Sequence, residues 1–227
     1  GNEGPLADAV EAALRGAGFG TVDALEILRD GDAVCARTHL GLADRVVLAG
    51  HLDTVPIADN VPGRTEVRDG VEVVWGRGSV DMLAGCAAAL ALACEAGAAI
   101  AGGAQQVLTS DVTWIFYDHE EVASHLNGLG RIQRRFPDWL AGDLALLGEP
   151  TAAQVEGGCN GTLRVIAHFP GRASHSARAW MGVNAIHAMA PSLSASPPTE
   201  TPSRWSTASS SANRFRSCAS RAASRTT

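Results

Sequence analysis

Lysine is missing from this sequence of 227 residues, so all 18 of its basic side chains are arginines. These arginines do not cluster in the first 190 residues and the net charge is −6, which argues against nucleic acid as a partner. No apolar run approaches the roughly 20 residues of a membrane-spanning helix. The Ala-rich stretch 86–100 is interrupted by Glu95 and Gly97, so we expect it to form a buried helix.

The sequence also lacks the even number of cysteines that is typical of a disulfide framework. None of its five cysteines are spaced as C-x-x-C. No signal peptide is recognisable either. Both observations predict reduced thiols and a cytoplasmic protein. The chain starts with Gly1 rather than Met, so we expect native residues in front of it.

Acidic residues nearly vanish at the end of the chain. Residues 191–227 contain 11 Ser, 5 Thr, 4 Pro, 5 Arg and 6 Ala but only one acid, Glu200. Such a composition cannot bury enough apolar surface to offset its chain entropy. We expect a disordered tail that arises from out-of-frame translation after about Ala190, and a natural disordered tail is the alternative.

Helical and strand patterns alternate before this tail. Helices are expected at 5–17, 82–96, 126–135 and 182–190, and strands at 25–28, 33–38, 45–49, 71–75, 112–117, 143–147 and 161–168. The alternation predicts an α/β fold with a mixed, mostly parallel central sheet flanked by helices. Ligand sites in such sheets lie at the carboxyl ends of strands.

Two polar clusters lie at such strand ends: one contains a histidine with an aspartate, and the other contains a single aspartate. His51 and Asp53 follow the apolar run RVVLAG, and a histidine held by a carboxylate is typical of a zinc site. A capped surface loop is the alternative. Asp81 precedes the Ala-rich helix, where it is either a metal ligand or an N-cap.

The other two clusters are acidic. His119, Glu120 and Glu121 follow the run VTWIFY, and neighbouring carboxylates repel one another unless a cation lies beside them. A solvated turn is the alternative here, and Glu149 ends a further buried strand. Together these nitrogen and oxygen ligands suit Zn²⁺, Co²⁺ or Mn²⁺, and an Asp between two ions is the usual core of a two-metal hydrolase.

The four clusters, in this order and spacing, resemble the zinc aminoacylase/carboxypeptidase family of peptidases from Gly1 to about Ala190. The segments HLDTVP, GRGSVDM, HEE and GEPT carry the resemblance. Within the family, YDHEEV, NGLGR and GRASHSA are similar to the actinobacterial branch that hydrolyses N-succinyl-LL-2,6-diaminopimelate to succinate and LL-2,6-diaminopimelate. The resemblance therefore implies an amide hydrolase with a small N-succinyl amino-acid substrate. It also implies that residues 1–160 belong to the catalytic domain and that residues 161–190 begin a small α+β lid or dimerisation domain.

The resemblance implies a role for each matched residue. His51 resembles a terminal ligand of the first zinc and Asp53 the carboxylate that orients it. Asp81 resembles the ligand that bridges two zinc ions, and Glu120 the general base. The remaining matches are Glu121 as a ligand of the second zinc, Glu149 as a ligand of the first, His175 as the lid-domain histidine that reaches the partner subunit's site and stabilises the oxyanion, and Asn160 and Arg178 as substrate contacts.

One expected ligand is missing from this chain. The family supplies a second histidine to the second zinc from near its C-terminus, and no histidine follows His187. We therefore expect a two-zinc homodimer for the full-length enzyme and little or no activity for this chain. Poor solubility is also expected, because strands such as 112–117 would lack part of their cover.

Other readings stay open at this point. An acetylornithine deacetylase or a metallocarboxypeptidase of the same family would share these motifs. A non-catalytic metal-binding or dimerisation module and a pseudogene product are further alternatives. No role is expected for His39, His125, His168 and His187, whereas His119 either supports the metal ligands or is a polar turn residue.

Overall fold

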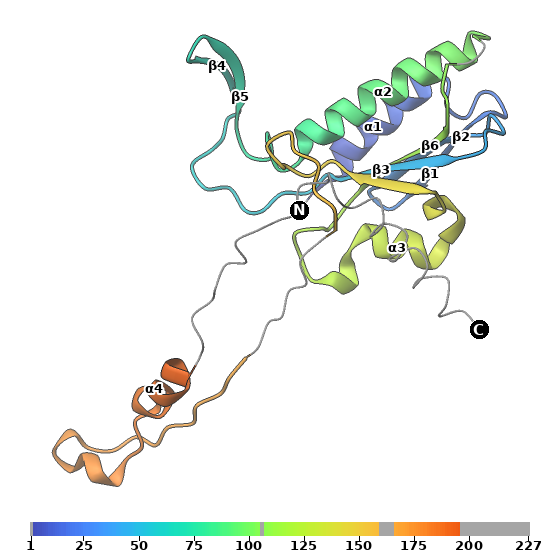
Figure 1. The fold of residues 1–227 in the computed structure, drawn as a ribbon. Helices are drawn as coiled ribbons and strands as arrows, with labels where there is room; N and C mark the ends of the chain where they lie inside the picture. Colours follow the sequence, from blue (N-terminus) through green and yellow to red (C-terminus); the bar gives the residue numbers. More distant parts are fainter. Residues whose placement is uncertain (1, 105–106, 159–165, 196–227) are drawn as a thin grey trace, which may run out of the picture. The chain divides into compact units, whose positions relative to one another are not determined.

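The computed structural model describes residues 2–104, 107–158 and 166–195, and the chain divides into two compact units, Gly1–Ala152 and Ala153–Thr227. The first unit contains a five-stranded sheet in the order β1-β2-β6-β3-β7 (Figure 1). Its strands are β1 (Leu25–Asp30), β2 (Ala33–Thr38), β3 (Arg45–His51), β6 (Asp111–Tyr117) and β7 (Leu144–Leu147).

Four strands of this sheet run in the same direction. The β6–β3 and β3–β7 pairs are parallel, whereas β2 is antiparallel to both of its neighbours, β1 and β6. The expected mixed, mostly parallel sheet is confirmed. Because β3, β6 and β7 are parallel neighbours, the residues that follow them emerge at one edge of the sheet.

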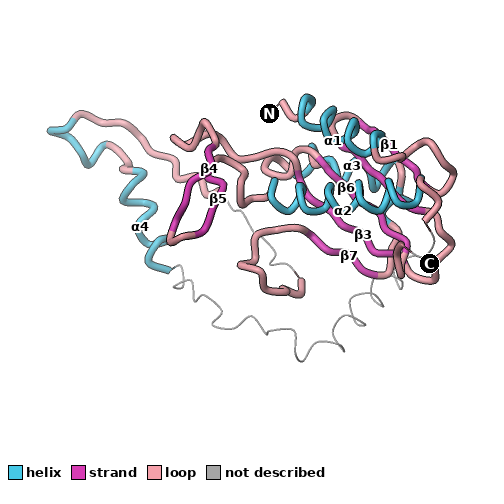
Figure 2. The backbone as a smooth tube through the Cα atoms, turned by 90° about the horizontal axis from the view of Figure 1, so that it is seen from above, coloured by secondary structure: helices cyan, strands magenta, loops and turns pink. Residues whose placement is uncertain are grey.

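Helices cover both faces of the sheet. Figure 1 shows α1 (Gly4–Gly16) and α2 (Leu83–Ala101) on one face and α3 (Gly128–Arg135) on the other, followed by the short helix η2 (Pro137–Leu140). Figure 2 shows α2 running along the strands. Phe19 and Trp114 lie in the core beneath α1 and α2, whereas Ile132 and Trp139 lie in the core beneath α3.

The first helix follows from its local sequence. Pro5 lies in its first turn, where a missing N–H costs nothing. Ala7, Val10 and Leu14 recur at helical spacing and are all buried. The chain then turns through Gly18, whose φ of +102° suits glycine. The helix expected at 5–17 is thus confirmed to within a residue at each end.

The Ala-rich helix α2 is longer and less buried than expected. It runs to Ala101, and its inner face contributes Cys86, Ala93 and Ala96 to the core, while Leu92 on its outer face is 56% exposed. Among the described residues it is the one helix long and apolar enough to cross a membrane, by length and composition alone. Core helices of globular proteins pass the same test, and α2 packs one face against the sheet, although only 22% of its apolar window is buried.

The expectation that the strand 112–117 lacks cover is wrong. Every residue of β6 is buried, because α1 and α2 cover one face and α3 covers the other. The strand before Glu149 was expected to be buried, and this expectation is wrong as well: in β7, at the edge of the sheet, Leu144, Leu146 and Leu147 are 40–57% exposed. An exposed apolar edge strand is the kind of surface that promotes association, although β7 is short.

A separate hairpin was only half anticipated from the sequence. The expected strand 71–75 is β5 (Val71–Trp75), and it pairs with β4 (Arg64–Arg68), which the sequence analysis missed. The segment RTEVR alternates charged and uncharged residues and both of its faces are largely exposed, so it lacks the apolar run that identifies a core strand.

The second unit contains the short helix η3 (Ser176–Met181) and α4 (Ala185–Ala195), with an isolated bridge between Arg172 and Val183. The expected helix 182–190 is confirmed in α4, which begins at Ala185. The helix continues to Ala195, so the expectation of a disordered tail is wrong for residues 191–195. Residues 161–165 of the expected strand lie outside the described residues, and 166–168 adopt no regular structure. The expected tail beyond residue 195 lies outside the described residues as well.

Candidate metal centre

The register of the sheet brings three of the four polar clusters together. His51, the last residue of β3, is paired with Tyr117, the last residue of β6, so the acidic cluster begins just beyond it. Ala49 is paired with Leu147, the last residue of β7, and Glu149 lies two residues further on, as His51 does on β3. Parallel strands therefore deliver these side chains to one edge, as the sequence predicted.

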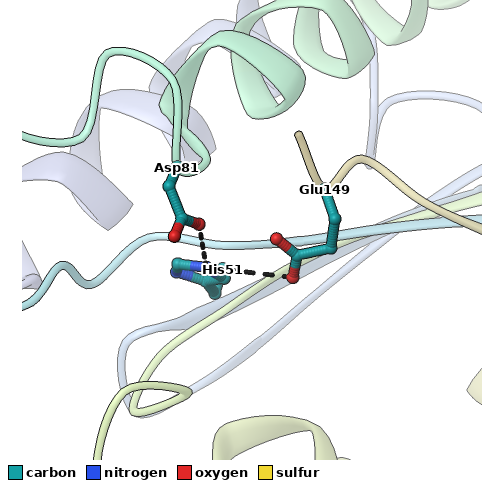
Figure 3. Close-up of side chains that lie close together, drawn as sticks. All are labelled: His51, Asp81 and Glu149. Carbon is teal, nitrogen blue, oxygen red and sulfur yellow. Dashed lines mark hydrogen bonds and ion pairs between the residues drawn. The ribbon is translucent and has the colours of Figure 1, made fainter. Parts of the chain in front are cut away.

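His51 lies at the middle of this edge. Its side chain is 1% exposed, and its Nε2 lies 3.3 Å from Oδ1 of Asp81 and 3.9 Å from Oε1 of Glu149 (Figure 3). Candidate ligand atoms of these three residues all lie within 4.8 Å of one another. Asp81 comes from the loop that precedes α2, so the group combines a loop residue with two strand ends.

The ring of His51 is oriented for Nε2 to act as the ligand atom. Its Nδ1 lies 2.9 Å from the backbone carbonyl oxygen of Asp53, to which only a protonated nitrogen can donate. In the neutral ring the lone pair is then on Nε2, which faces Asp81 and Glu149. The Asp53 carboxylate is 3.6 Å from Nδ1, beyond hydrogen-bond distance, so Asp53 orients the ring through its main chain.

The carboxylate of Asp53 instead holds the acidic cluster. Its Oδ1 accepts from the backbone N–H of Glu120 and its Oδ2 from that of Glu121, both at 2.9 Å. Asp53 is 6% exposed, and hydrogen bonds to a buried carboxylate are strong. One residue thus orients the histidine with its carbonyl group and fixes the backbone of two acidic residues with its side chain.

Two sulfur atoms support the backbone of His51 from the α2 side. The His51 N–H donates to Sδ of Met82 at 3.2 Å, and Sγ of Cys86 donates to the His51 carbonyl oxygen at 3.2 Å. Burial, assisted by the charge of Glu149, raises the pKa of the Cys86 thiol to about 12. The thiol therefore remains protonated at neutral pH and serves as a donor beneath the centre rather than as a thiolate ligand.

A second group of ligand atoms overlaps the first. Candidate atoms of His51, Glu120 and Glu121 also lie within 4.8 Å of one another. Burial raises the pKa of Glu121, and the neighbouring charges of Glu120 and Asp81 raise it further. Burial likewise raises the pKa of Glu149, against the opposing effect of His51.

This donor set fits a divalent cation. Burial is the main cause of the raised pKa values of Glu121 and Glu149, and the charges of neighbouring carboxylates raise them further. A cation between these carboxylates would remove their mutual repulsion. Histidine and carboxylate ligands without thiolate suit zinc and its first-row neighbours. The structure therefore contains a candidate metal site at the edge where the sequence predicted one.

The sequence analysis missed one pair of residues behind the acidic cluster. Asp118 accepts two hydrogen bonds from Arg131 of α3 and a third from Nδ1 of His119 at 2.6 Å. Burial by itself raises the pKa of Asp118, but the hydrogen bonds from Arg131 and His119 hold it below its ordinary value. The segment NGLGR contains Arg131, yet no local pattern indicates that it reaches the end of β6.

The remaining predicted site residues belong to other parts of the chain. His175 and Arg178 lie in the second unit, where the His175 carbonyl oxygen accepts from the Arg178 N–H at 2.8 Å. Asn160 lies outside the described residues. His39, His125, His168 and His187 are exposed, and none belongs to either ligand group among the described residues.

Comparisons with known proteins identify the family of this chain. The sequence profile of Peptidase family M20/M25/M40 matches residues 47–222, a range that reaches into the Ser-rich segment. A succinyl-diaminopimelate desuccinylase of Corynebacterium glutamicum is 48% identical over 194 residues, which are 86% of this chain and 49% of that protein. The DapE protein of Mycobacterium tuberculosis H37Rv is 51% identical over 185 residues, 82% of this chain and 48% of that protein.

The fold comparison gives the same architecture. The crystal structure of the aminopeptidase PepT from Bacillus cereus superposes with a TM-score of 0.50 and 17% identity, covering 84% of this chain and 50% of that one. At this identity the likeness concerns the fold alone. The chain spans about half the length of the curated relatives it matches.

Proposed function

The chain belongs to the peptidase family M20/M25/M40, and on that premise we propose that it is the N-terminal part of a succinyl-diaminopimelate desuccinylase. The reaction would be hydrolysis of N-succinyl-LL-2,6-diaminopimelate to succinate and LL-2,6-diaminopimelate, in diaminopimelate and lysine biosynthesis in the cytoplasm. The observation that carries the hydrolase chemistry is the convergence of His51, Asp81 and Glu149 within 4.8 Å. The choice of acyl group rests on the identity to the Corynebacterium enzyme.

In this proposal His51, Asp81 and Glu149 hold one zinc ion, and Glu121 with Asp81 takes part in holding a second, with Co²⁺ or Mn²⁺ as possible substitutes. Zinc in such a site polarises a substrate carbonyl group and acidifies water. The ring of His51 is held for this task by Asp53 and by the two sulfur atoms beneath it.

Glu120 serves as the general base in this proposal. Its carboxylate would take a proton from the attacking water and later deliver it to the leaving amine. Two features support the assignment: its backbone N–H is fixed by Asp53, and its carboxylate belongs to the same group of atoms as His51. A base held this way stays within reach of the reacting atoms without having to be a ligand.

His175 would stabilise the negative oxygen that develops on the substrate carbonyl. Its Nδ1 accepts from the backbone N–H of Ala177 at 3.2 Å, so in the neutral ring the proton is on Nε2. That proton makes Nε2 a donor, as oxyanion stabilisation requires. We place His175 in the site of the partner subunit of a homodimer, with Asn160 and Arg178 as contacts to the substrate.

Zinc titration of the metal-free chain tests the site. Isothermal titration calorimetry should show binding that His51→Ala abolishes and that His39→Ala, which removes an exposed histidine, leaves unchanged. Equal binding by the wild-type chain and His51→Ala would remove the basis of the proposal.

A chimera tests the reaction. We would replace the matched part of the Corynebacterium enzyme by this chain and assay it in parallel with succinyl-diaminopimelate, acetylornithine and a peptide. Release of succinate alone supports the desuccinylase. Faster turnover of the acetyl substrate or of the peptide would reassign the chain to a deacetylase or a carboxypeptidase of the same family.

A further inference from the structure

We propose that Arg131 is a positioning residue for this centre: through the buried Asp118 it fixes the loop that presents Glu120 and Glu121. The inference rests on the proposed function for the catalytic and metal-binding roles of Glu120 and Glu121. The contacts that hold the loop do not depend on it. Arg131 lies in α3, on the face of the sheet opposite α2, and its side-chain hydrogen bonds among the described residues go to Asp30 and Asp118.

The contact between Arg131 and Asp118 is bidentate and partly buried. Asp118 follows β6 directly, and its side chain is 3% exposed. Nη2 of Arg131 donates to Oδ1 at 2.6 Å and Nη1 donates to Oδ2 at 3.1 Å. A buried carboxylate needs such a partner, because without one it carries an uncompensated charge out of water.

The same guanidinium group is anchored to a second strand. Its Nε donates to Oδ2 of Asp30 at 3.1 Å and its Nη2 donates to the Asp30 carbonyl oxygen at 2.7 Å. Asp30 ends β1, and the side chain of Arg131 therefore ties the ends of β1 and β6 together. A lysine could keep the charge but not this planar set of contacts.

The backbone beyond Asp118 turns sharply and needs to be held. His119 has φ of +61°, in the left-handed region that non-glycine residues rarely adopt, and its Nδ1 is hydrogen-bonded to Asp118. Gly128 at the start of α3 donates its N–H to the Asp118 carbonyl oxygen at 2.8 Å, and a Cβ at Gly128 would collide with Asp118. Helix α3 and the turn therefore pack as one unit.

The loop is thus fixed from two sides. Asp118 and Arg131 hold its start, and the Asp53 carboxylate holds the N–H groups of Glu120 and Glu121. If Arg131 is replaced by alanine, Asp118 loses its bidentate hydrogen bonds and moves toward water, and the turn at residue 119 moves with it. The two N–H groups then leave Asp53, and Glu120 and Glu121 lose their shared orientation.

Hydrogen exchange of the metal-free 227-residue chain tests the contacts directly. Arg131→Ala should speed exchange in peptides that cover residues 118–122 by about tenfold, while peptides within β6 keep wild-type exchange. Arg134→Ala is the matched control, because Arg134 lies exposed on the same helix. Arg131→Lys serves as a milder variant, with an intermediate increase, should the alanine variant fail to fold. Unchanged exchange at 118–122 in the folded variant overturns the proposal.

Zinc titration of the same variants tests the consequence for the centre. Zinc affinity should fall by about 10–100-fold in Arg131→Ala and stay unchanged in Arg134→Ala. Faster exchange with wild-type zinc affinity would make Arg131 a structural residue only and overturn its positioning role. If the wild-type chain itself binds no zinc, the proposed function fails, and the exchange result still decides whether Arg131 holds the loop.

Discussion

Gly50→Ala should disturb the metal centre through the side chains of Met82 and Cys86, which pack against β3. Gly50 precedes His51 in β3, and a Cβ there would lie 2.7 Å from Sγ of Cys86 and 2.7 Å from Cε of Met82. Ordinary carbon contacts are about 3.5–4.0 Å, so the overlap is close to 1 Å with each side chain. These are the two residues whose sulfur atoms support the backbone of His51.

The expected cost follows from this overlap. Overpacking of a dense core costs about 1–3 kcal/mol, which lowers Tm by roughly 2–10 °C in a chain of this size. Cys86→Ala removes one of the two clashing atoms. The double variant Gly50→Ala/Cys86→Ala should therefore be less destabilised than the sum of the single variants, by about 1 kcal/mol.

Urea unfolding followed by tryptophan fluorescence measures these differences, because Trp114 and Trp139 are buried in the two cores. Gly16→Ala is the control, since a Cβ there meets no atom within 4 Å, and it should be neutral or slightly stabilising. Equal stability of Gly50→Ala and Gly16→Ala, or strict additivity with Cys86→Ala, would refute the packing argument.

Three further predictions concern pH, a buried carboxylate and the gene. Zinc affinity should fall as the pH drops toward 5, because the pKa values of Glu121 and Glu149 are raised and protonated carboxyl groups no longer bind; calorimetry at pH 7.5 and 5 checks this. Asp111→Asn should cost about 1–3 kcal/mol in urea unfolding at pH 7, since Asp111 accepts three hydrogen bonds. Its pKa is lowered against the effect of burial by those bonds, so the difference from wild type should shrink as the pH falls below about 4. Sequencing the gene across codons 185–227 should reveal a shifted reading frame, and an unshifted frame that relatives share would refute that interpretation.

The sequence predicted where the site lies but not how it is supported. Strands that end in His51 and just before Glu149 could be recognised from their apolar runs, and parallel pairing places their ends together. The separate roles of the Asp53 carbonyl group and carboxylate could not be predicted, because the bend after β3 decides which of the two faces the histidine. Arg131 was missed since it acts across 13 residues and from another layer of the fold.

The cover of the sheet was misjudged for a related reason. The apolar run of β6 indicates burial but not which elements supply it, and in the structure α1 and α2 cover one face and α3 covers the other. Every residue of β7 is exposed, and among the described residues β7 pairs with β3 alone and so lies at the edge of the sheet. Edge position depends on strand order, which a single strand's sequence does not specify.

The number of ions that this chain holds follows from the ring of His51. Nδ1 is engaged by the Asp53 carbonyl group, so one lone pair, on Nε2, must serve both ligand groups. An ion bound by His51, Asp81 and Glu149 has the three protein ligands typical of a catalytic zinc. A second ion would then find only Glu121 and a shared Asp81 among the described residues, since Glu120 is needed as the base. We therefore expect one tight equivalent of zinc per chain and a second that is far weaker, and two equally tight equivalents in calorimetry would contradict this assignment of ligands.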